Sequence, residues 1–385
     1  MVKISIILPC YNAGEYLHRS IPNCLHQTLK DIEIICVNDS STDNTAEILQ
    51  EYANKDNRIK IITQENQGTL VARKRGIEHA SGEYCMFLDQ DDFYELCACA
   101  ELYSIIKEQD VEILEFNANV IEKNNTSFSC SSFPYKHQKL HALDALEKIF
   151  ENQRHFRPWI WVKIFSTSLC KRVLPYIPEK YMTLHEDVLM FMMCFLFAET
   201  YYNIDNAYYT HYKDIGFCKG YSFSQFQKAL SSAKILFSTL NDFIQNQKPD
   251  PYIEKILKKL IYWIELDCFQ RFTTLCPPEQ YKEGFLLILN TVSTGVLTEK
   301  YMQQYQLMQK QSKLIQQQES ELRFYTSSPS NLNLTQALHS FHSHFPFLFK
   351  IQCNMLCRTH QIAQSLKQNG FRETCKKIIR YILKK

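Results

Sequence analysis

Short apolar segments alternate with helical patterns throughout the first quarter of the chain. The predicted strands are Lys3–Leu8, Ile32–Val37, Arg58–Thr63 and Tyr84–Leu88. The predicted helices are Glu15–Gln27, one that begins at Asn44 with Glu47 as its capping partner, and Thr69–Ala80. Parallel strands need a crossover connection that is usually a helix. The alternation therefore predicts the α/β class, with a mostly parallel, doubly wound sheet.

Each predicted strand is followed by a polar loop. These loops are Tyr11–Asn12, Asn38–Ser40, Gln64–Gly68 and Asp89–Asp92. In open α/β sheets, ligands bind outside the carboxyl ends of the strands. We therefore expect the four loops to line a single crevice.

The last of these loops carries a cluster of acids. Asp89, Asp91 and Asp92 follow directly after an apolar strand. Mg²⁺ and Mn²⁺ prefer carboxylate oxygens and share their remaining positions with phosphate. No Gly-x-Gly-x-x-Gly follows the first strand and no Walker lysine motif occurs, so neither a dinucleotide site nor a P-loop is supported. The cluster predicts a divalent cation and chemistry on a nucleotide diphosphate.

Composition narrows the class of protein. The chain has 385 residues, of which 45% are hydrophobic and 13% aromatic, and this favours an ordered protein of more than one domain. A net charge of +2 argues against nucleic-acid binding as the main function. The cysteines are scattered and form no CxxC pair, which predicts reduced thiols. The chain starts directly with a strand, and its longest apolar run, Val188–Ala198, is too short to cross a bilayer, so we expect a cytoplasmic protein.

Several motifs occur in an order that resembles family 2 glycosyltransferases. They are Ile7–Leu17, Val37–Asp43, Asn66–Gly68 with Ala72–Arg73, and Ala80–Tyr84 leading into Asp89–Asp92. The resemblance covers residues 1 to about 95 and continues more loosely to about 215. It implies the Rossmann-like GT-A fold, an inverting reaction, a nucleotide-diphosphate sugar as donor, with a UDP-sugar expected, and Mn²⁺ or Mg²⁺ as cofactor.

The resemblance also implies which residues bind the donor. They are Pro9, Tyr11, Asn12, Glu15, Asp39, Arg73, Asp89 and Gln90. In this scheme Asp39 accepts hydrogen bonds from the base, as a carboxylate can. Asp89 contacts the ribose side or the metal, and Asp91 coordinates the metal.

Three of these assignments have a plainer alternative. Asp39 is also explained as a helix-entry residue, and Arg73 as a solvated charge on a helix. Glu15 is equally a first-turn acid that the helix dipole stabilises. Lys74 stands where the family often has Asn, which weakens the assignment of a ligand contact to this part of the helix.

A second acidic motif opens an apolar helix at Glu186–Asp187. By resemblance, Asp187 is the general base that takes a proton from the incoming hydroxyl on the face opposite the leaving diphosphate. The alternative is a helix N-terminus in which the acids only cap the dipole. Contacts to the acceptor or the diphosphate are assigned to Trp161, Glu186, His211 and Lys213. Trp161 has packing in the core as its alternative.

The rest of the chain predicts helices and an irregular segment. Residues 117–139 look polar and irregular, and Arg157–Phe165 resembles the family's Trp-x-Lys segment within an apolar strand. Two further strands are predicted at Thr200–Ile204 and Ala207–Tyr212. Long helices are predicted at Phe223–Ile244, Tyr252–Leu275, Pro278–Val292 and Leu297–Phe324. We expect three parts: a catalytic domain at 1–215, a helical domain at 216–325, and a linker with terminal helices at 326–385.

Two features of the C-terminal third suggest partners. Tyr301, Met308, Ile315 and Leu322 recur every seven residues, which fits a homodimer seam or an intramolecular helix hairpin. Residues 371–385 form a basic amphipathic helix pattern. Such a helix is typical of peripheral contact with anionic lipid, or of docking on its own domain.

Together these features predict an enzyme that moves a sugar to a hydroxyl of a glycan or lipid-linked acceptor. The resemblance suggests a step in bacterial lipopolysaccharide or capsule synthesis. One alternative is a nucleotidyltransferase, although Pro9–Gly14 lacks the glycine- and lysine-rich loop of that class. Another is a catalytically silent GT-A scaffold for glycan assembly, against which the intact Asp89, Asp91 and Asp187 argue.

Overall fold

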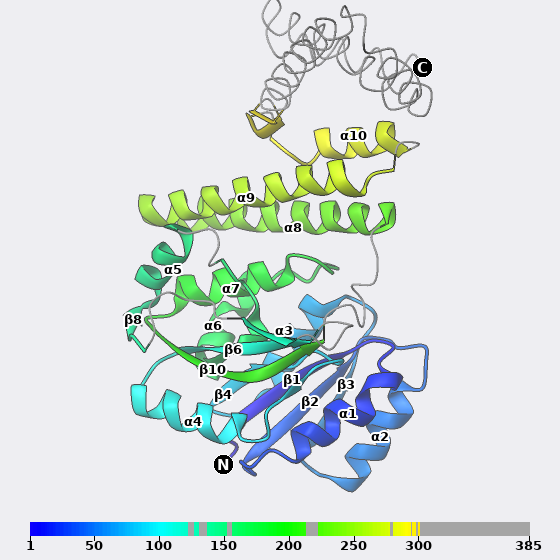
Figure 1. The fold of residues 1–385 in the computed structure, drawn as a ribbon, viewed down its shortest axis with the longest axis vertical. Coiled ribbons are helices and arrows are strands. Elements are labelled where there is room, and N and C mark those ends of the chain that lie inside the picture. Colours follow the sequence, from blue (N-terminus) through cyan, green and yellow to red (C-terminus); the bar gives the residue numbers. More distant parts are fainter. Residues whose placement is uncertain are drawn as a thin grey trace, which may run out of the picture. The chain divides into compact units, whose positions relative to one another are not determined.

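The computed structural model describes residues 1–121, 127–130, 137–151, 156–212, 222–277, 280–293, 295–297 and 299–300 (Figure 1). The chain divides into two compact units, Met1–Gln280 and Tyr281–Lys385. No helix within the described ranges is long and apolar enough to cross a membrane.

A mixed sheet forms the centre of the first unit. Its strands are β1 (Ile4–Cys10), β2 (Ile32–Asn38), β3 (Ile59–Thr63), β4 (Tyr84–Phe87), β5 (Phe93–Tyr94), β6 (Ile113–Ile121), β7 (Ser127–Cys130), β8 (Leu140–His141), β9 (Lys163–Ser166) and β10 (Thr200–Tyr212). Their main order is β3-β2-β1-β4-β9-β6-β10-β5, while β7 pairs with β6 and β8 with β10. The β1–β2, β1–β4, β2–β3 and β6–β10 pairs are parallel. The strand β9 lies antiparallel between β4 and β6, so β1, β4, β6 and β10 all point the same way. The short strands β5, β7 and β8 also pair antiparallel with their neighbours.

Helices cover both faces of this sheet (Figure 1). The helices α1 (Gly14–Leu25), α2 (Thr45–Lys55) and α4 (Ala98–Gln109) share one apolar core with alternate residues of the strands. On the other face, α3 (Thr69–His79), α6 (Thr167–Val173) and α7 (Glu186–Phe197) pack against one another and the sheet. Because both faces are covered, β1, β2 and β4 are apolar almost throughout.

The helix α3 approaches β1 very closely at Gly76. A Cβ atom added there would lie 2.4 Å from Cγ2 of Ile7. The missing side chain lets the α3 backbone sit directly on the sheet. This close contact fixes the position of Arg73, one turn earlier on the same helix.

Several helices complete the described structure. Before β9 lie α5 (Ala142–Glu151) and the 3₁₀ turn η2 (Ile160–Val162), and after α6 comes the 3₁₀ turn η3 (Leu174–Tyr176). Next come α8 (Phe223–Gln247) and α9 (Pro251–Leu275), which lie side by side in the first unit (Figure 1). Ser222 caps α8 and Asp250 caps α9.

The second unit contains α10 (Tyr281–Leu289). The predicted boundary at 215, the seven-residue repeat at 301–322 and the basic segment 371–385 lie outside the described residues, so these remain predictions.

Three local predictions are wrong. The segment after 117 is not simply irregular, because β6 continues to Ile121 between β10 and β7. Its polar Asn117 is accommodated by a 2.7 Å hydrogen bond from the side-chain amide to the carbonyl of Asp205. The two strands predicted at Thr200–Ile204 and Ala207–Tyr212 form one strand, β10, with a shift in register between them. Trp161 lies in η2 rather than in a strand.

Candidate functional site

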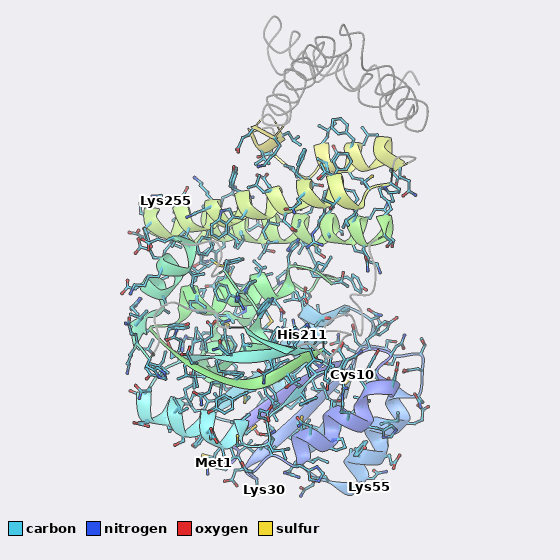
Figure 2. All side chains as sticks on the ribbon, in the orientation of Figure 1. Met1, Cys10, Lys30, Lys55, His211 and Lys255 are labelled. Atoms are coloured by element: carbon cyan, nitrogen blue, oxygen red, sulfur yellow. The ribbon has the colours of Figure 1, made fainter. Side chains whose placement is uncertain are left out.

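The carboxyl ends of the parallel strands meet at one edge of the sheet. Cys10 at the end of β1 and His211 near the end of β10 mark this edge in Figure 2. Two hydrogen bonds join the loops after β1 and β4: the Tyr11 amide donates to Oε1 of Gln90 over 2.9 Å, and Nε2 of Gln90 donates to the Tyr11 carbonyl over 3.3 Å. The loops expected to converge are therefore held together by direct contacts.

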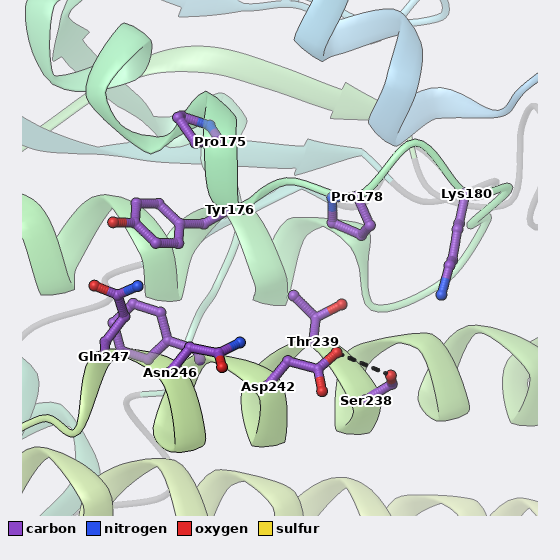
Figure 3. Close-up of a pocket in the computed structure, with 10 residues that line it drawn as sticks. Pro175, Tyr176, Pro178, Lys180, Ser238, Thr239, Asp242, Asn246 and Gln247 are labelled. Carbon is purple, nitrogen blue, oxygen red and sulfur yellow. Dashed lines mark hydrogen bonds between the residues drawn. The ribbon is translucent and has the colours of Figure 1, made fainter.

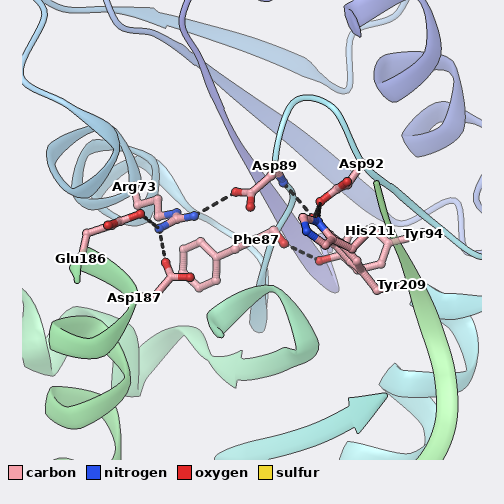
Figure 4. Close-up of polar contacts among 9 residues, drawn as sticks. All are labelled: Arg73, Phe87, Asp89, Asp92, Tyr94, Glu186, Asp187, Tyr209 and His211. Carbon is pink, nitrogen blue, oxygen red and sulfur yellow. Dashed lines mark hydrogen bonds and ion pairs between the residues drawn. The ribbon is translucent and has the colours of Figure 1, made fainter. Parts of the chain in front are cut away.

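A buried arginine connects this edge to the start of α7. Arg73 is 2% exposed, and its Nη2 donates to Oδ1 of Asp89 over 2.9 Å. Its Nη1 pairs with Oδ1 of Asp187 and lies 3.7 Å from Oε1 of Glu186. Figure 4 shows the guanidinium between the acids of α7 and the acid after β4. Asp89 and Asp187, from distant parts of the chain, therefore contact the same side chain.

The arginine cluster holds more acid than base. Burial opposes a charge on Arg73, but three surrounding carboxylates, led by that of Asp187, outweigh it and raise the pKa of the guanidinium. Burial and the neighbouring Asp187 raise the pKa of Glu186 to about 7. Burial also raises the pKa of Asp187, although Arg73 lowers it in part. Both acids of α7 consequently bind a proton more readily than an ordinary carboxylate.

Asp92 has a structural role that the sequence did not indicate. Its side chain is fully buried and accepts hydrogen bonds from the Tyr209 hydroxyl and the Tyr212 amide, each over 2.9 Å. Nδ1 of His211 lies 2.9 Å from the same carboxylate (Figure 4). Burial lowers the pKa of His211 but the carboxylate of Asp92 more than offsets this, so the net shift is upward. Asp92 thus ties the acidic loop to the end of β10.

Asp89 and Asp91 fit a divalent cation that also binds phosphate. Burial and the charges of Asp92 and Asp89 raise the pKa of Asp91 to about 7, so its ionised form is disfavoured unless positive charge is nearby. No group of three or more His, Cys, Asp or Glu suited to a metal occurs in the described part of the chain. Mg²⁺ sites commonly use one or two carboxylates and complete their coordination with water and substrate phosphates.

Arg19 is a further side chain at this loop that the sequence analysis missed. Its guanidinium donates to the carbonyl of Asp91 and lies 4.5 Å from the ring centre of Tyr212. The residue sits on the exposed side of α1, where no sequence signal separates it from an ordinary surface charge.

Asp39 shapes the loop before α3. Its Oδ1 accepts from Nε2 of Gln64 over 2.8 Å and from the Gln67 amide over 2.9 Å, and its Oδ2 accepts from the Gly68 amide over 2.8 Å. A carboxylate has about four acceptor positions, so these three bonds leave one for another donor. Gly68 adopts a φ of 83°, which glycine accommodates without strain.

The remaining donor-site candidates surround the end of β1. Pro9 pairs with Val37 at the end of that strand. Asn12 has a φ of 48° and accepts from the Thr42 amide over 2.8 Å, which joins the loops after β1 and β2. Glu15 is exposed in the first turn of α1.

The Trp161 side chain is buried among other aromatic rings. It is 5% exposed and stacks on Trp159 and Tyr209, with ring centres 5.1 Å and 4.6 Å away, and its ring centre also lies 5.3 Å from His211. This burial favours the packing alternative. Lys213 lies outside the described residues.

Lys163, in the Trp-x-Lys segment, is a buried cation near α7. Its Nζ lies 3.4 Å from Oε2 of Glu115 and donates to the carbonyls of Trp159 and Arg157 over 2.9 Å and 3.2 Å. Burial lowers the pKa of Lys163, and Glu115 opposes that shift. The Trp-x-Lys motif drew attention to Lys163, but the sequence did not indicate that Glu115 is its buried partner.

A surface hollow of about 340 Å³ lies between η3 and α8 (Figure 3). Its lining includes Tyr176, Pro178, Lys180, Asp242 and Asn246. None of the residues predicted for donor binding or catalysis lines it.

Known proteins resemble this chain in sequence. Residues 5–172 match the model of glycosyl transferase family 2. EpsH of Bacillus subtilis is 36% identical over 168 residues, which are 43% of this chain and 47% of EpsH. A cholesterol galactosyltransferase of Borreliella burgdorferi is 28% identical over 252 residues, 64% of this chain and 68% of that protein. The chain thus spans about half the length of EpsH.

Solved structures resemble it in fold. S. aureus TarS 1-349, crystallised in complex with UDP-GlcNAc, matches with a TM-score of 0.60 at 20% identity, over 77% of this chain and 83% of TarS 1-349. At this identity the likeness concerns the fold. It confirms the predicted GT-A arrangement, a mostly parallel sheet followed by helices.

Proposed function

Because residues 5–172 match the model of glycosyl transferase family 2, we propose that the chain moves a sugar from a nucleotide-diphosphate sugar to an acceptor hydroxyl with inversion at the anomeric carbon. The observation that carries this proposal is the Arg73 cluster, which puts Asp89 and Asp187 on one guanidinium. A donor-binding acid and a candidate base are thereby held on opposite sides of a single fixed group.

Asp187 is the proposed general base. Its raised pKa makes it a better proton acceptor than an ordinary aspartate, and Arg73 fixes the direction of its Oδ1. The acceptor hydroxyl gives its proton to this carboxylate while its oxygen bonds to the anomeric carbon. The bond from that carbon to the diphosphate breaks, and the nucleoside diphosphate leaves with the electron pair.

Asp91 and Asp89 are the proposed ligands for Mn²⁺ or Mg²⁺. When bound, such a cation would neutralise the charge that grows on the departing phosphate oxygen. Asp89 would also stay paired with Arg73, so the same carboxylate links the phosphate side of the site to the base. Asp92 keeps the loop in place through β10 and is not expected to bind the cation.

The base of the donor would lie between the loops after β1 and β2. The free acceptor position of Asp39 suits the imide N–H of uracil, and this supports a UDP-sugar. The similarity to a cholesterol galactosyltransferase supports a lipid or lipid-linked acceptor. A role in bacterial surface polysaccharide synthesis at the cytoplasmic face of the membrane is the cellular task that we propose.

Removal of the metal tests the donor-site assignment. We expect UDP to raise the melting temperature of the wild type more with Mn²⁺ than with EDTA, because binding to the folded state stabilises it. Asp91→Asn should lose this Mn²⁺-dependent increment. Glu95→Gln, an exposed acid just after β5, is the matched control and should keep it. An equal increment in Asp91→Asn and wild type would refute the metal assignment.

A further inference from the structure

One exposed aromatic ring stands near the loops proposed to bind the donor. Tyr181 is 45% exposed. Among the described residues, the other exposed large hydrophobic side chains are Met1 and Leu96. Met1 is the first residue and Leu96 precedes α4, whereas Tyr181 lies in the segment between η3 and α7. That segment leads directly to Glu186 and Asp187.

The ring lies against the loop that Asp39 shapes. Cδ2 of Tyr181 is 3.4 Å from the point where a Cβ atom on Gly68 would lie, and the carbonyl oxygen of Met182 is 2.8 Å from the same point. The Gly68 amide in turn donates to Asp39. The missing side chain at Gly68 therefore allows the backbone of Met182, the residue after Tyr181, to approach the loop closely.

The loop after β1, which carries Tyr11, also lies near Tyr181. Burial raises the pKa of the Tyr181 phenol above its usual value, and the nearby side chains of Tyr11 and Asp39 add to this shift. At neutral pH the phenol is therefore uncharged, and its ring offers a flat apolar surface. The loops after β1 and β2 and the segment before α7 thus come together around Tyr181.

The segment that carries Tyr181 is fastened on both sides. Nζ of Lys74 donates to the carbonyl of Ile177 over 3.0 Å and lies 3.2 Å from Oε1 of Glu179. On the other side, the Thr183 amide donates to Oγ of Ser232 on α8 over 3.4 Å. These contacts hold the backbone of the segment in position before a ligand arrives, which lowers the entropy cost of binding.

From this geometry we infer that Tyr181 stacks on the nucleobase of the donor, beside the one acceptor position that Asp39 retains. An aromatic face attracts any base, while a carboxylate selects a base with an N–H donor. The inference deepens the proposed function and rests on it. It also gives Lys74, which departs from the family pattern, a positioning role for the segment 177–181.

Calorimetric titration of the full-length protein with UDP and Mn²⁺ tests this inference. Tyr181→Ala should weaken UDP binding about tenfold, since a base–aromatic stack contributes that much or more. Tyr181→Phe keeps the ring and should bind within about twofold of wild type. Tyr181→Leu keeps apolar bulk without a flat ring and should also lose affinity. Leu96→Ala is the control for removing an exposed apolar side chain.

Pyrophosphate with Mn²⁺ separates stacking from a general loss of structure. Because pyrophosphate has no base, its affinity should be the same in Tyr181→Ala and wild type. Equal losses for UDP and pyrophosphate would overturn the inference, and so would wild-type UDP affinity in Tyr181→Ala. In both cases the proposed function would stand, whereas a wild type that binds neither UDP nor any other nucleoside diphosphate would overturn both.

Discussion

Among single residues, Arg73 matters most because it connects Asp89 with Asp187. Its sequence context suggested a ligand contact or a solvated helix charge, but its side chain is buried and its two Nη atoms pair with three acids. A planar guanidinium can bridge two carboxylates at fixed angles, which an ammonium group cannot. We therefore assign Arg73 a positioning role: it orients Asp187 and Asp89 relative to each other.

Arg73→Lys tests that role. Lysine preserves the charge but not the bridge, so we expect turnover to fall by at least about tenfold and the free energy of unfolding to fall by roughly 1–3 kcal/mol. Steady-state kinetics and urea unfolding measure the two effects. Arg75→Lys, two residues along α3 and 37% exposed, is the matched control. Wild-type turnover in Arg73→Lys would show that the bridge is not needed.

Glu186 gives a prediction for pH dependence. Its pKa is about 7 in the folded protein and near 4.5 when unfolded, so the folded state binds the proton more tightly. This group therefore lowers stability as pH rises from about 4.5 to about 7. Glu186→Gln cannot ionise and should gain stability over wild type at pH 8, on the order of 1–3 kcal/mol, but little at pH 4.5.

Chemical unfolding at both pH values measures this difference. Glu78→Gln, a partly exposed acid on α3, controls for the loss of a surface carboxylate. A Glu186→Gln variant that is less stable than wild type at pH 8 would contradict the assigned shift.

At the scale of elements, the packing of α3 on β1 decides where the arginine lies. Gly76 permits an approach that any side chain would prevent. The helix then presents Arg73 toward α7, while Lys74 reaches the segment before it. The helix α3 therefore positions both the candidate general base, Asp187, and the segment 177–181 that we propose stacks on the nucleobase.

Gly76→Ala should push α3 away from the sheet. We expect a loss of about 1–3 kcal/mol in the free energy of unfolding, because overpacking outweighs the better helix propensity of alanine. Gly295→Ala is the control, since an added Cβ there meets no described atom within 4 Å. If Gly76→Ala is as stable as wild type, the contact with Ile7 is not as tight as the structure indicates.

At the scale of the whole molecule, the sequence predicted the framework well. The strands β1 to β4 and helices α1 to α3 were predicted within a few residues, because apolar runs and loop residues carry local signals. The GT-A fold followed from the order of motifs and is confirmed. The extended β6, the single strand β10 and the turn at Trp161 were missed, since pairing between distant segments decided them.

The site was predictable in its parts but not in its connections. Arg73 and Asp187 are 114 residues apart in sequence, and Asp92 and Tyr209 are 117 apart. No local sequence pattern shows that Arg73 pairs with Asp187, or that Asp92 binds Tyr209 near the end of β10. The chemical roles of Asp39, Asp91 and Asp187 remain proposals that experiments on donor binding and turnover decide.

Turnover by Asp187→Asn tests whether Asp187 is the general base. The assay measures release of UDP from a UDP-sugar, alongside calorimetric titration with UDP and Mn²⁺. We predict UDP affinity within about threefold of wild type and turnover lower by about 10²–10⁴-fold, the usual contribution of a general base. Turnover within about tenfold of wild type, with UDP affinity retained, would contradict the account, because the base would then have to be another group.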